Sequence, residues 1–395
     1  MRATDNFFAR KRQWSRLKDR ILGAYLKPYL AKIARTRRPT LIVDCFAGKG
    51  AFDDGEPGSP LIIADAISDA MRSRPDTRAR GLFIEKKYHT DLRENLRRFE
   101  DCQVLAGTYE EHMAEMDAVI QPQTNVLLFV DPYGIKSLDM ARFRHILSLP
   151  VNTVELIMNF ATFGFLREGC RLKRGEGFDC ADDSDVYEDD PDSANTPERM
   201  NAIAGGNYWN DILDRYYTEE LDMRAAEQAF TNDYMDRVRQ LFNHVVSIPV
   251  QYRRGQLPKY RLIYGTQSPD GVILMADNMG RVWRDFVAQD RGGQGALFEE
   301  IDYPDMANQE GYRLEDDVVS LAGEGIELKT LEVQLIGKYG ITFPEKELKR
   351  RIKEMEQRGD ISVRRDPPRT PKTGRVATSM DYTKYRIWIA RANDG

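Results

Sequence analysis

Apolar residues recur every three or four positions between residues 11 and 35, which is the period of an amphipathic helix. The positions that follow this period are Trp14, Leu17, Ile21, Tyr25, Tyr29 and Ile33. A continuous apolar run follows at residues 40–46 and ends at Gly48 and Gly50. Such a run is typical of a buried parallel strand, and the glycines predict a tight turn directly after it.

Strand-like and helix-like segments then alternate along the chain. Ser59 is expected as the N-cap of the next helix and Pro60 as its first residue, where the missing N–H of proline costs nothing. Further strands are predicted at residues 81–85, 103–106, 126–130 and 154–160, and further helices at residues 88–99, 110–120 and 138–147. Because βαβ crossovers are right-handed and place helices outside the sheet, this order predicts a doubly wound α/β domain.

The segments that follow predict how this domain ends. A helix is expected at residues 225–243, strands at 245–252 and 260–264, and a last helix at 272–288. An antiparallel hairpin at the end of a five-stranded parallel sheet is the layout of the Rossmann-like methyltransferases. We therefore expect a basic N-terminal helix that packs on the core (residues 1–40), an α/β domain (41–290) with an acidic insertion (168–205), and a linker (291–310).

Residues 311–395 predict a separate small domain. Helices are expected near residues 314–321, 330–338 and 344–357, and strands at 360–365 and 385–390. Three helices followed by a two-stranded ribbon match a winged helix. On the third helix, Leu348, Ile352 and Met355 form a core stripe, and the other face carries Lys346, Lys349, Arg350 and Lys353. This basic face suits a nucleic-acid groove, and a protein-docking winged helix is the alternative.

Charge is distributed unevenly around the formal net charge of −5. Residues 1–40 hold twelve Lys and Arg against two Asp, whereas residues 176–192 hold nine carboxylates and no Lys or Arg. Such an acidic run is typical of a solvated loop, with an electrostatic gate or a partner-binding insertion as alternatives. Residues 311–395 hold seventeen Lys and Arg against fourteen Asp and Glu, so both ends of the chain are basic, which favours nucleic acid as a partner.

Composition excludes several classes of protein. No run approaches eighteen apolar residues, and no apolar segment follows the basic N-terminus, so we expect neither a membrane span nor a secretory signal and place the protein in the cytoplasm. The four cysteines lack C-x-x-C spacing and the four histidines lack paired spacing. We therefore expect no disulfide and no metal site.

Candidate ligand-binding residues follow the first three predicted strands. In an open α/β sheet the ligand binds beyond the carboxyl ends of the strands, where Asp44, Phe46, Gly48 and Gly50 form a turn that lets a ligand approach the backbone. A tight turn without a ligand is the alternative. Two further candidates are Glu85, whose carboxylate suits ribose hydroxyls or a surface pair with a neighbouring lysine, and Thr108, whose hydroxyl suits the border of an adenine ring.

The fourth predicted strand ends at Asp131-Pro132-Tyr133-Gly134, the position at which methyltransferases hold the group to be alkylated. An exocyclic amine attacks a sulfonium methyl group when a carboxylate and a carbonyl accept its protons, while an aromatic ring stacks on the base. Asp131, the Pro132 carbonyl and Tyr133 suit these three roles. A strand end turned by proline and glycine is the alternative.

Several motifs in order resemble the bacterial three-Cys-motif partner proteins, TcmP, over residues 10–290. They are Trp14-x-x-x-Lys18, Asp44-x-Phe46-Ala47-Gly48-x-Gly50, Gly58-Ser59-Pro60, Phe129-Val130-Asp131-Pro132-Tyr133-Gly134 and Met158-Asn159-Phe160. The resemblance implies a partner, a radical-SAM-like protein that carries the three cysteines. It also implies a distant relation to adenine-N6 methyltransferases, which carry Asp/Asn-Pro-Pro-Tyr where this chain has one proline fewer.

Two functions are therefore predicted. The first is an S-adenosylmethionine-dependent methyltransferase that acts on nucleic acid, either DNA or RNA. The second is a non-catalytic subunit with a methyltransferase-like fold that docks the three-Cys protein, which the changed Asp-Pro-Tyr-Gly motif favours. An NAD-binding dehydrogenase fits less well, since Glu85 follows Asp44 by 41 residues, against about 20 in the dinucleotide fingerprint.

Overall fold

The computed structural model describes residues 8–392 except 10, 12, 133, 136–138, 175–194, 251–257, 259 and 293–312. The strands of the large sheet are β1 (Thr40–Asp44), β2 (Ala79–Glu85), β3 (Cys102–Ala106), β4 (Asn125–Val130), β5 (Thr153–Phe160), β6 (His244–Val250) and β7 (Tyr260–Thr266). The helices between and around them are α1 (Gln13–Ile33), α2 (Ser59–Ser73), α3 (His89–Leu96), α4 (Met113–Val119), α5 (Met140–Ser148), α6 (Thr162–Arg174), α7 (Pro197–Ala204), α8 (Trp209–Tyr217), α9 (Met223–Arg239) and α10 (Pro269–Gly292), with a 3-10 turn, η2, at Ala34–Thr36.

The seven strands lie in the order β3-β2-β1-β4-β5-β7-β6. The first five pair in parallel, and β7 runs antiparallel to both β5 and β6. The prediction of a doubly wound α/β sheet that ends in an antiparallel hairpin is confirmed. This architecture is consistent with the layout of a Rossmann-like methyltransferase.

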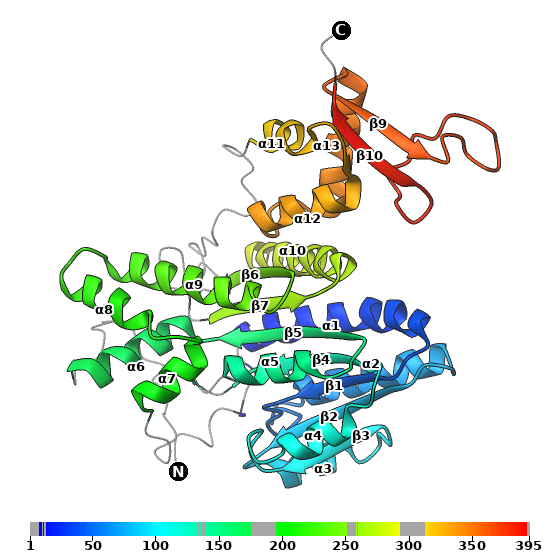
Figure 1. The fold of residues 1–395 in the computed structure, drawn as a ribbon. Coiled ribbons are helices and arrows are strands. Elements are labelled where there is room, and N and C mark those ends of the chain that lie inside the picture. Colours follow the sequence, from blue (N-terminus) through cyan, green and yellow to red (C-terminus); the bar gives the residue numbers. More distant parts are fainter. Residues whose placement is uncertain are drawn as a thin grey trace.

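Helices cover both faces of this sheet, as its buried strands require. Every residue of β1 and β4 is buried, so neither strand has a face left for solvent. Right-handed crossovers place α2 and α3 on one face and α4 and α5 on the other, because strand order reverses between β1 and β4. On the α2 side, α1 packs against both α2 and α10 (Figure 1). Its buried face supplies Leu17, Ile21, Leu22, Tyr25, Leu26, Tyr29 and Leu30 to the core.

The strand registers bring the predicted site residues to one edge of the sheet. Asp44 pairs with Phe83 on one side and with Phe129 on the other, so Glu85 and Asp131 each lie two residues past the level of Asp44. The carboxyl ends of β1, β2 and β4 therefore present three carboxylates side by side at the switch point of the sheet.

Three helices between β5 and β6 were not predicted from the sequence. The described parts of the expected acidic insertion, residues 168–205, are largely helical and belong to α6 and α7, and α8 follows. These helices are amphipathic but short, and they pack on one another and on α9 rather than forming a long periodic stripe. Residues 176–192 and most of the expected linker lie outside the described residues.

The C-terminal unit has its own core. It contains α11 (Leu314–Ala322), β8 (Ile326–Glu327), α12 (Leu328–Tyr339), α13 (Glu345–Arg358), β9 (Ile361–Asp366) and β10 (Arg386–Arg391). The sheet has three antiparallel strands in the order β8-β10-β9, one more than predicted, because the two-residue β8 is too short to show a pattern. This unit lies beside α10 in Figure 1, and Ile336 and Ile341 pack into the core of the large domain. Among the described helices of both units, none is long and apolar enough to cross a membrane.

Candidate functional site

The side chain of Asp44, the last residue of β1, stabilises the turn that contains Gly48 and Gly50, which we call the glycine turn. Its carboxylate is fully buried; one oxygen accepts the backbone N–H of Phe46 at 3.2 Å and the other accepts the Ser59 hydroxyl at 2.6 Å. Ser59 is the first residue of α2 rather than its N-cap, because its hydroxyl binds Asp44 and Gly58 takes the cap position. Burial raises the pKa of Asp44 from 3.8 to about 7.

Glu85 joins the glycine turn to the end of β2. Its Oε2 accepts the backbone N–H of Gly48 at 2.7 Å, and its Oε1 accepts the backbone N–H groups of Lys87 at 2.8 Å and Tyr88 at 2.9 Å. The predicted alternative, a side-chain pair with a neighbouring lysine, is not what holds this carboxylate. Glu85 therefore positions the turn and keeps lone pairs for further donors.

The glycine turn requires glycine. Gly48 and Gly50 have φ angles of +64° and +85°, the left-handed region that residues with a Cβ rarely adopt. A Cβ on Gly50 would lie 3.0 Å from the Leu92 side chain, and one on Gly48 would lie 3.3 Å from the ring of Phe8. The turn is therefore closely packed on one side by α3 and on the other by Phe8.

Phe8 lies over the outer surface of this turn. Its ring packs edge-on against Tyr88 with ring centroids 5.0 Å apart, and the ammonium of Lys49 lies 5.0 Å from the Phe8 ring. The backbone carbonyl of Phe8 also accepts the N–H of Asp53 at 2.8 Å. Phe8 thus covers the surface at which a ligand would approach Gly48. Phe46, the remaining predicted residue of the turn, is half-buried.

Thr108 lies just past β3, and its backbone N–H and hydroxyl both form hydrogen bonds within the turn that follows. Its backbone N–H donates to Oε2 of Glu111 at 2.7 Å, and its hydroxyl accepts the N–H of Glu111 at 3.3 Å. This reciprocal pair is a capping box, so a purely structural role accounts for the residue. The neighbouring Tyr109 is buried and was not singled out from the sequence.

Asp131 is held by two side chains from distant parts of the chain. Lys18 of α1 places its ammonium 2.7 Å and 2.6 Å from the two carboxylate oxygens, and Nδ2 of Asn159, from β5, donates to Oδ1 at 3.0 Å. The Lys18 side chain is 9% exposed and that of Asp131 23%. Lys18 also lies 5.4 Å from the ring of Tyr260, at the start of β7.

Asn159 leaves one polar atom unused beside Asp131. Its side chain is buried at 2% exposure, and its Oδ1 has no hydrogen-bond partner among the residues that the structure describes. The amide orientation follows from the contact, since Oδ1 in place of Nδ2 would face a carboxylate oxygen. A buried acceptor without a donor is costly and marks a place where a donor from a ligand would be favourable.

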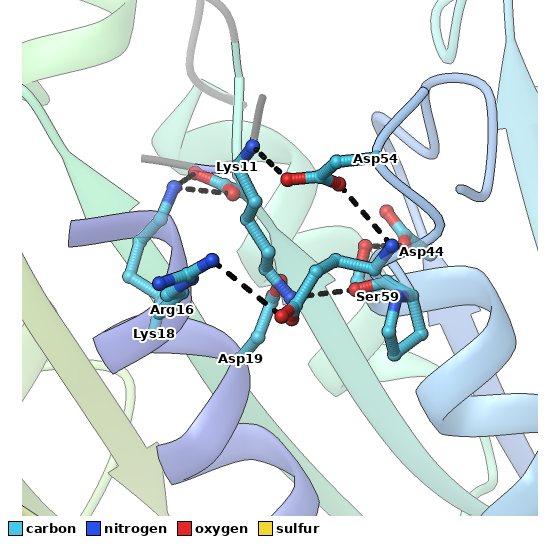
Figure 2. Close-up of polar contacts among 10 residues, drawn as sticks. Lys11, Arg16, Lys18, Asp19, Asp44, Asp54 and Ser59 are labelled. Atoms are coloured by element: carbon cyan, nitrogen blue, oxygen red, sulfur yellow. Dashed lines mark hydrogen bonds and ion pairs between the residues drawn. The ribbon is translucent and has the colours of Figure 1, made fainter. Parts of the chain in front are cut away.

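A second ion pair, between Lys11 and Asp19, joins the segment before α1 to α1 itself beside this site. Lys11 donates to the Pro57 carbonyl at 2.6 Å and contacts Asp19 at 2.7 Å, while its backbone N–H donates to Asp54 at 3.0 Å. Figure 2 shows Lys11 between Asp19 and the loop that carries Asp54. Burial raises the pKa of Asp19 to about 6, against the lowering effect of Lys11. Sequence analysis did not single out either Lys11 or Asp19.

Pro132 and Tyr133 are the other two predicted catalytic residues. Pro132 is buried directly after Asp131. Tyr133 lies outside the described residues, so the stacking role expected for it stays a prediction. Gly134 has a φ of +81°, which accounts for a glycine at this turn.

The basic face of α13 divides into exposed and paired residues. Lys346, Arg350 and Lys353 are exposed, and Lys346 and Lys353 have no carboxylate partner in the described part of the chain. Arg350 pairs with Glu347 and Glu354. Lys349, expected on the open face, is instead 20% exposed, pairs with Glu345, and lies 3.7 Å from the buried Glu332 and 4.0 Å from the Tyr382 ring. Lys349 is therefore less open to a phosphate than Lys346 and Lys353, because Glu332 and Glu345 lie beside its ammonium, and its contact with nucleic acid stays a prediction.

No resident metal is indicated by the residues that can be described. Within them, no group of three or more His, Cys, Asp or Glu side chains is arranged to hold an ion. The edge of the sheet instead gathers carboxylates and backbone donors. Such a set suits a ligand that carries hydroxyl and ammonium groups and disfavours phosphates, which the carboxylates would repel.

Comparisons with known proteins give only distant similarity. No family model and no curated protein matches the chain. Partly similar solved structures include the O-methyltransferase TomG from Streptomyces achromogenes in complex with SAM, at 12% identity over 61% of this chain and 78% of that one, with a TM-score of 0.29. A SAM-dependent methyltransferase from Aquifex aeolicus covers 60% of this chain and 89% of its own at 9% identity and a TM-score of 0.24. A conserved hypothetical protein of Streptococcus pyogenes covers 34% and 76% at 13% identity and a TM-score of 0.23. At these TM-scores the similarities establish neither a fold nor a function.

Proposed function

We propose that this chain binds S-adenosylmethionine at the carboxyl edge of the sheet and transfers its methyl group to an amino group of a nucleic acid. The observation that carries the proposal is the placement of the glycine turn, Glu85 and Asp131 on adjoining strand ends at the switch point. Ligands of open α/β sheets bind at this place. The carboxylates at this edge also fit the proposed cofactor, because S-adenosylmethionine is cationic and carries no phosphates.

Each residue of the site has a role in this proposal. When bound, S-adenosylmethionine supplies an electrophilic methyl group. Glu85 accepts the ribose hydroxyls while it holds Gly48, and Asp44 keeps the turn in place through Phe46. Asp131 and the Pro132 carbonyl accept hydrogen bonds from the attacking amine, and the Asp131 carboxylate takes the one proton that the amine loses on methylation. Thr108 borders the adenine in addition to capping its own turn.

Nucleic acid as the substrate is supported by the C-terminal unit. Its three helices and antiparallel strands have the element order that we interpret as a winged helix. Lys346, Arg350 and Lys353 form an exposed basic face on α13. We propose that this face holds the phosphate backbone while the large domain reaches the base.

A second candidate function is a non-catalytic subunit that docks a three-Cys-motif protein. Two contacts favour it: the Lys18 ammonium occupies both oxygens of Asp131, and the Phe8 ring covers Gly48. Both positions are needed for methyl transfer and both are filled by the protein's own side chains. A lapsed enzyme would tolerate such contacts.

Incubation with radiolabelled S-adenosylmethionine distinguishes the two functions. The protein is mixed with separate pools of DNA, transfer RNA, ribosomal RNA and protein, each with and without the three-Cys protein, and Asp131→Ala serves as the inactive control. Label that enters a nucleic acid and is lost in the variant supports the enzyme. Label in no pool, together with co-purification of the three-Cys protein, supports the subunit.

A further inference from the structure

Asp131 and Asn159 together form a pair of hydrogen-bond acceptors beside the glycine turn. Asp131 offers two carboxylate oxygens and Asn159 offers Oδ1, which is buried and lacks a donor in the described structure. The amide of Asn159 is fixed in this orientation by its own bond to Asp131 at 3.0 Å. Two adjacent acceptors, one of them charged, suit a nitrogen that carries at least two N–H groups.

An ammonium already occupies part of this pair. Nζ of Lys18 lies 2.6–2.7 Å from both oxygens of Asp131, and its side chain is almost fully buried. The face of the Tyr260 ring, 5.4 Å from the Lys18 ammonium, offers the same cation a second partner when it leaves the carboxylate. Asp131 itself remains 23% exposed.

From these contacts we propose that Asp131 and Asn159 are the binding site for a ligand nitrogen, and that Lys18 is a built-in competitor that the ligand must displace. The shared chemistry is an ammonium or a primary amine, and its two sources are the α-ammonium of S-adenosylmethionine and the exocyclic amine of the nucleic-acid substrate. The inference rests on the proposed function. It adds Lys18 and Asn159 as residues that set selectivity for amine-bearing ligands.

Two substitutions test the competitor, Lys18, and the acceptor, Asn159, independently. Lys18→Met removes the ammonium and keeps the length of the side chain, so amine binding should tighten roughly tenfold, the size of one charge-assisted hydrogen bond. Asn159→Leu removes the free acceptor at similar volume and should weaken binding by a similar factor. Lys27→Met, at an exposed position of the same helix, is the matched control and should change nothing. Thermal unfolding of each variant checks that it is folded.

The ligands separate the two sources of nitrogen. Calorimetry is performed with S-adenosylmethionine and with methylthioadenosine, which lacks the amino-acid group, and the KM for methyl transfer is measured with the nucleic acid that accepts label. If the cofactor supplies the nitrogen, both substitutions alter its affinity in opposite directions and leave methylthioadenosine unchanged. If the substrate supplies it, cofactor affinity stays constant while KM falls in Lys18→Met and rises in Asn159→Leu.

The outcomes that overturn the inference are equally distinct. If the cofactor affinity and the KM of both variants equal those of Lys27→Met, this inference is overturned and the proposed function is not. Should Lys18→Met fail to fold, an unchanged affinity and KM in Asn159→Leu are sufficient to overturn it. Failure of both ligands to bind any form of the protein overturns the proposed function and this inference with it.

Discussion

The backbone N–H of Gly48 donates to the Oε2 atom of Glu85 at 2.7 Å, so a side chain at the end of β2 fixes the conformation of the turn after β1. The other oxygen of Glu85 is held by the N–H groups of Lys87 and Tyr88. One carboxylate thus receives three backbone donors and remains beside the surface where a ribose would lie. In the function that we propose, the shape of the turn and the ribose contact depend on the same residue.

Glu85→Ala is expected to weaken S-adenosylmethionine binding at least tenfold, because it removes a charged acceptor and frees the turn together. Glu85→Gln should weaken it less, since its amide oxygen still accepts one set of N–H groups. Isothermal calorimetry measures both, with Glu100→Gln as an exposed control. Equal affinity in all three variants would remove Glu85 from the site.

Asp44→Asn is expected to raise stability at alkaline pH. The pKa of Asp44 is about 7 in the folded protein and 3.8 in the unfolded chain, so the folded state holds a proton that the unfolded state releases between these values. Wild-type stability therefore falls as pH rises from about 4 to about 7, and asparagine mimics the protonated form. Urea unfolding should show the Asp44→Asn variant more stable by on the order of 4 kcal/mol at pH 8 and by little at pH 4, since the shift spans about three pKa units and each corresponds to about 1.4 kcal/mol.

The other buried acids do not obscure this comparison. Burial also raises the pKa of Asp19 to about 6 and that of Glu155 to about 7, so both forms of the protein keep a pH-dependent stability. Only the difference between them reports on Asp44, and Asp76→Asn, at an exposed site, is the control. A difference that is constant across pH would show that Asp44 is ionised in the folded state.

Reversal of Lys346 and Lys353 to glutamate is expected to weaken nucleic-acid binding across all sequences. Each phosphate contact that is lost should reduce the slope of log affinity against log salt by roughly one. Fluorescence anisotropy at several salt concentrations measures this slope, and reversal of the exposed Arg78 and Arg80 is the matched control. A normal slope in the first variant would place the contact elsewhere.

Lys349→Glu should instead destabilise the C-terminal unit. Its ammonium lies 3.7 Å from the buried Glu332, whose pKa burial raises to about 8, and it also pairs with Glu345. A glutamate there places a third carboxylate among them, so we expect a loss of about 2 kcal/mol, less than for a fully buried pair. Lys353→Glu should stay within about 0.5 kcal/mol. Equal unfolding curves for both variants would contradict a stabilising role for the contacts of Lys349 with Glu332 and Glu345.

The fold was largely predictable because its signals are local. Continuous apolar runs identified β1 and β4, and the glycines after β1 marked the turn at Gly48 and Gly50. Ser59 was misassigned as a cap because its true partner, Asp44, is in contact only after the chain has folded. Helices α6 to α8 were missed since their short apolar faces pack on one another and on α9.

Only those site residues that lie at the end of a predicted strand, such as Glu85 and Asp131, were predictable from the sequence. The ion pair of Lys18 with Asp131 joins positions 113 residues apart, and no local pattern encodes that distance. A signal was nevertheless present: Lys18 lies on the apolar stripe of α1 together with Ile21 and Tyr25, and Asn159 interrupts the otherwise apolar end of β5. A polar residue at a position that the period buries is the feature to search for.

The central claim is that the carboxyl edge of the sheet binds S-adenosylmethionine, and calorimetric titration of the full-length chain tests it most directly. We expect saturable binding of one equivalent per chain, lost or strongly weakened in Glu85→Ala and retained in Glu100→Gln. No detectable heat at roughly millimolar ligand, where even an affinity of about −4 kcal/mol would be visible, would contradict it.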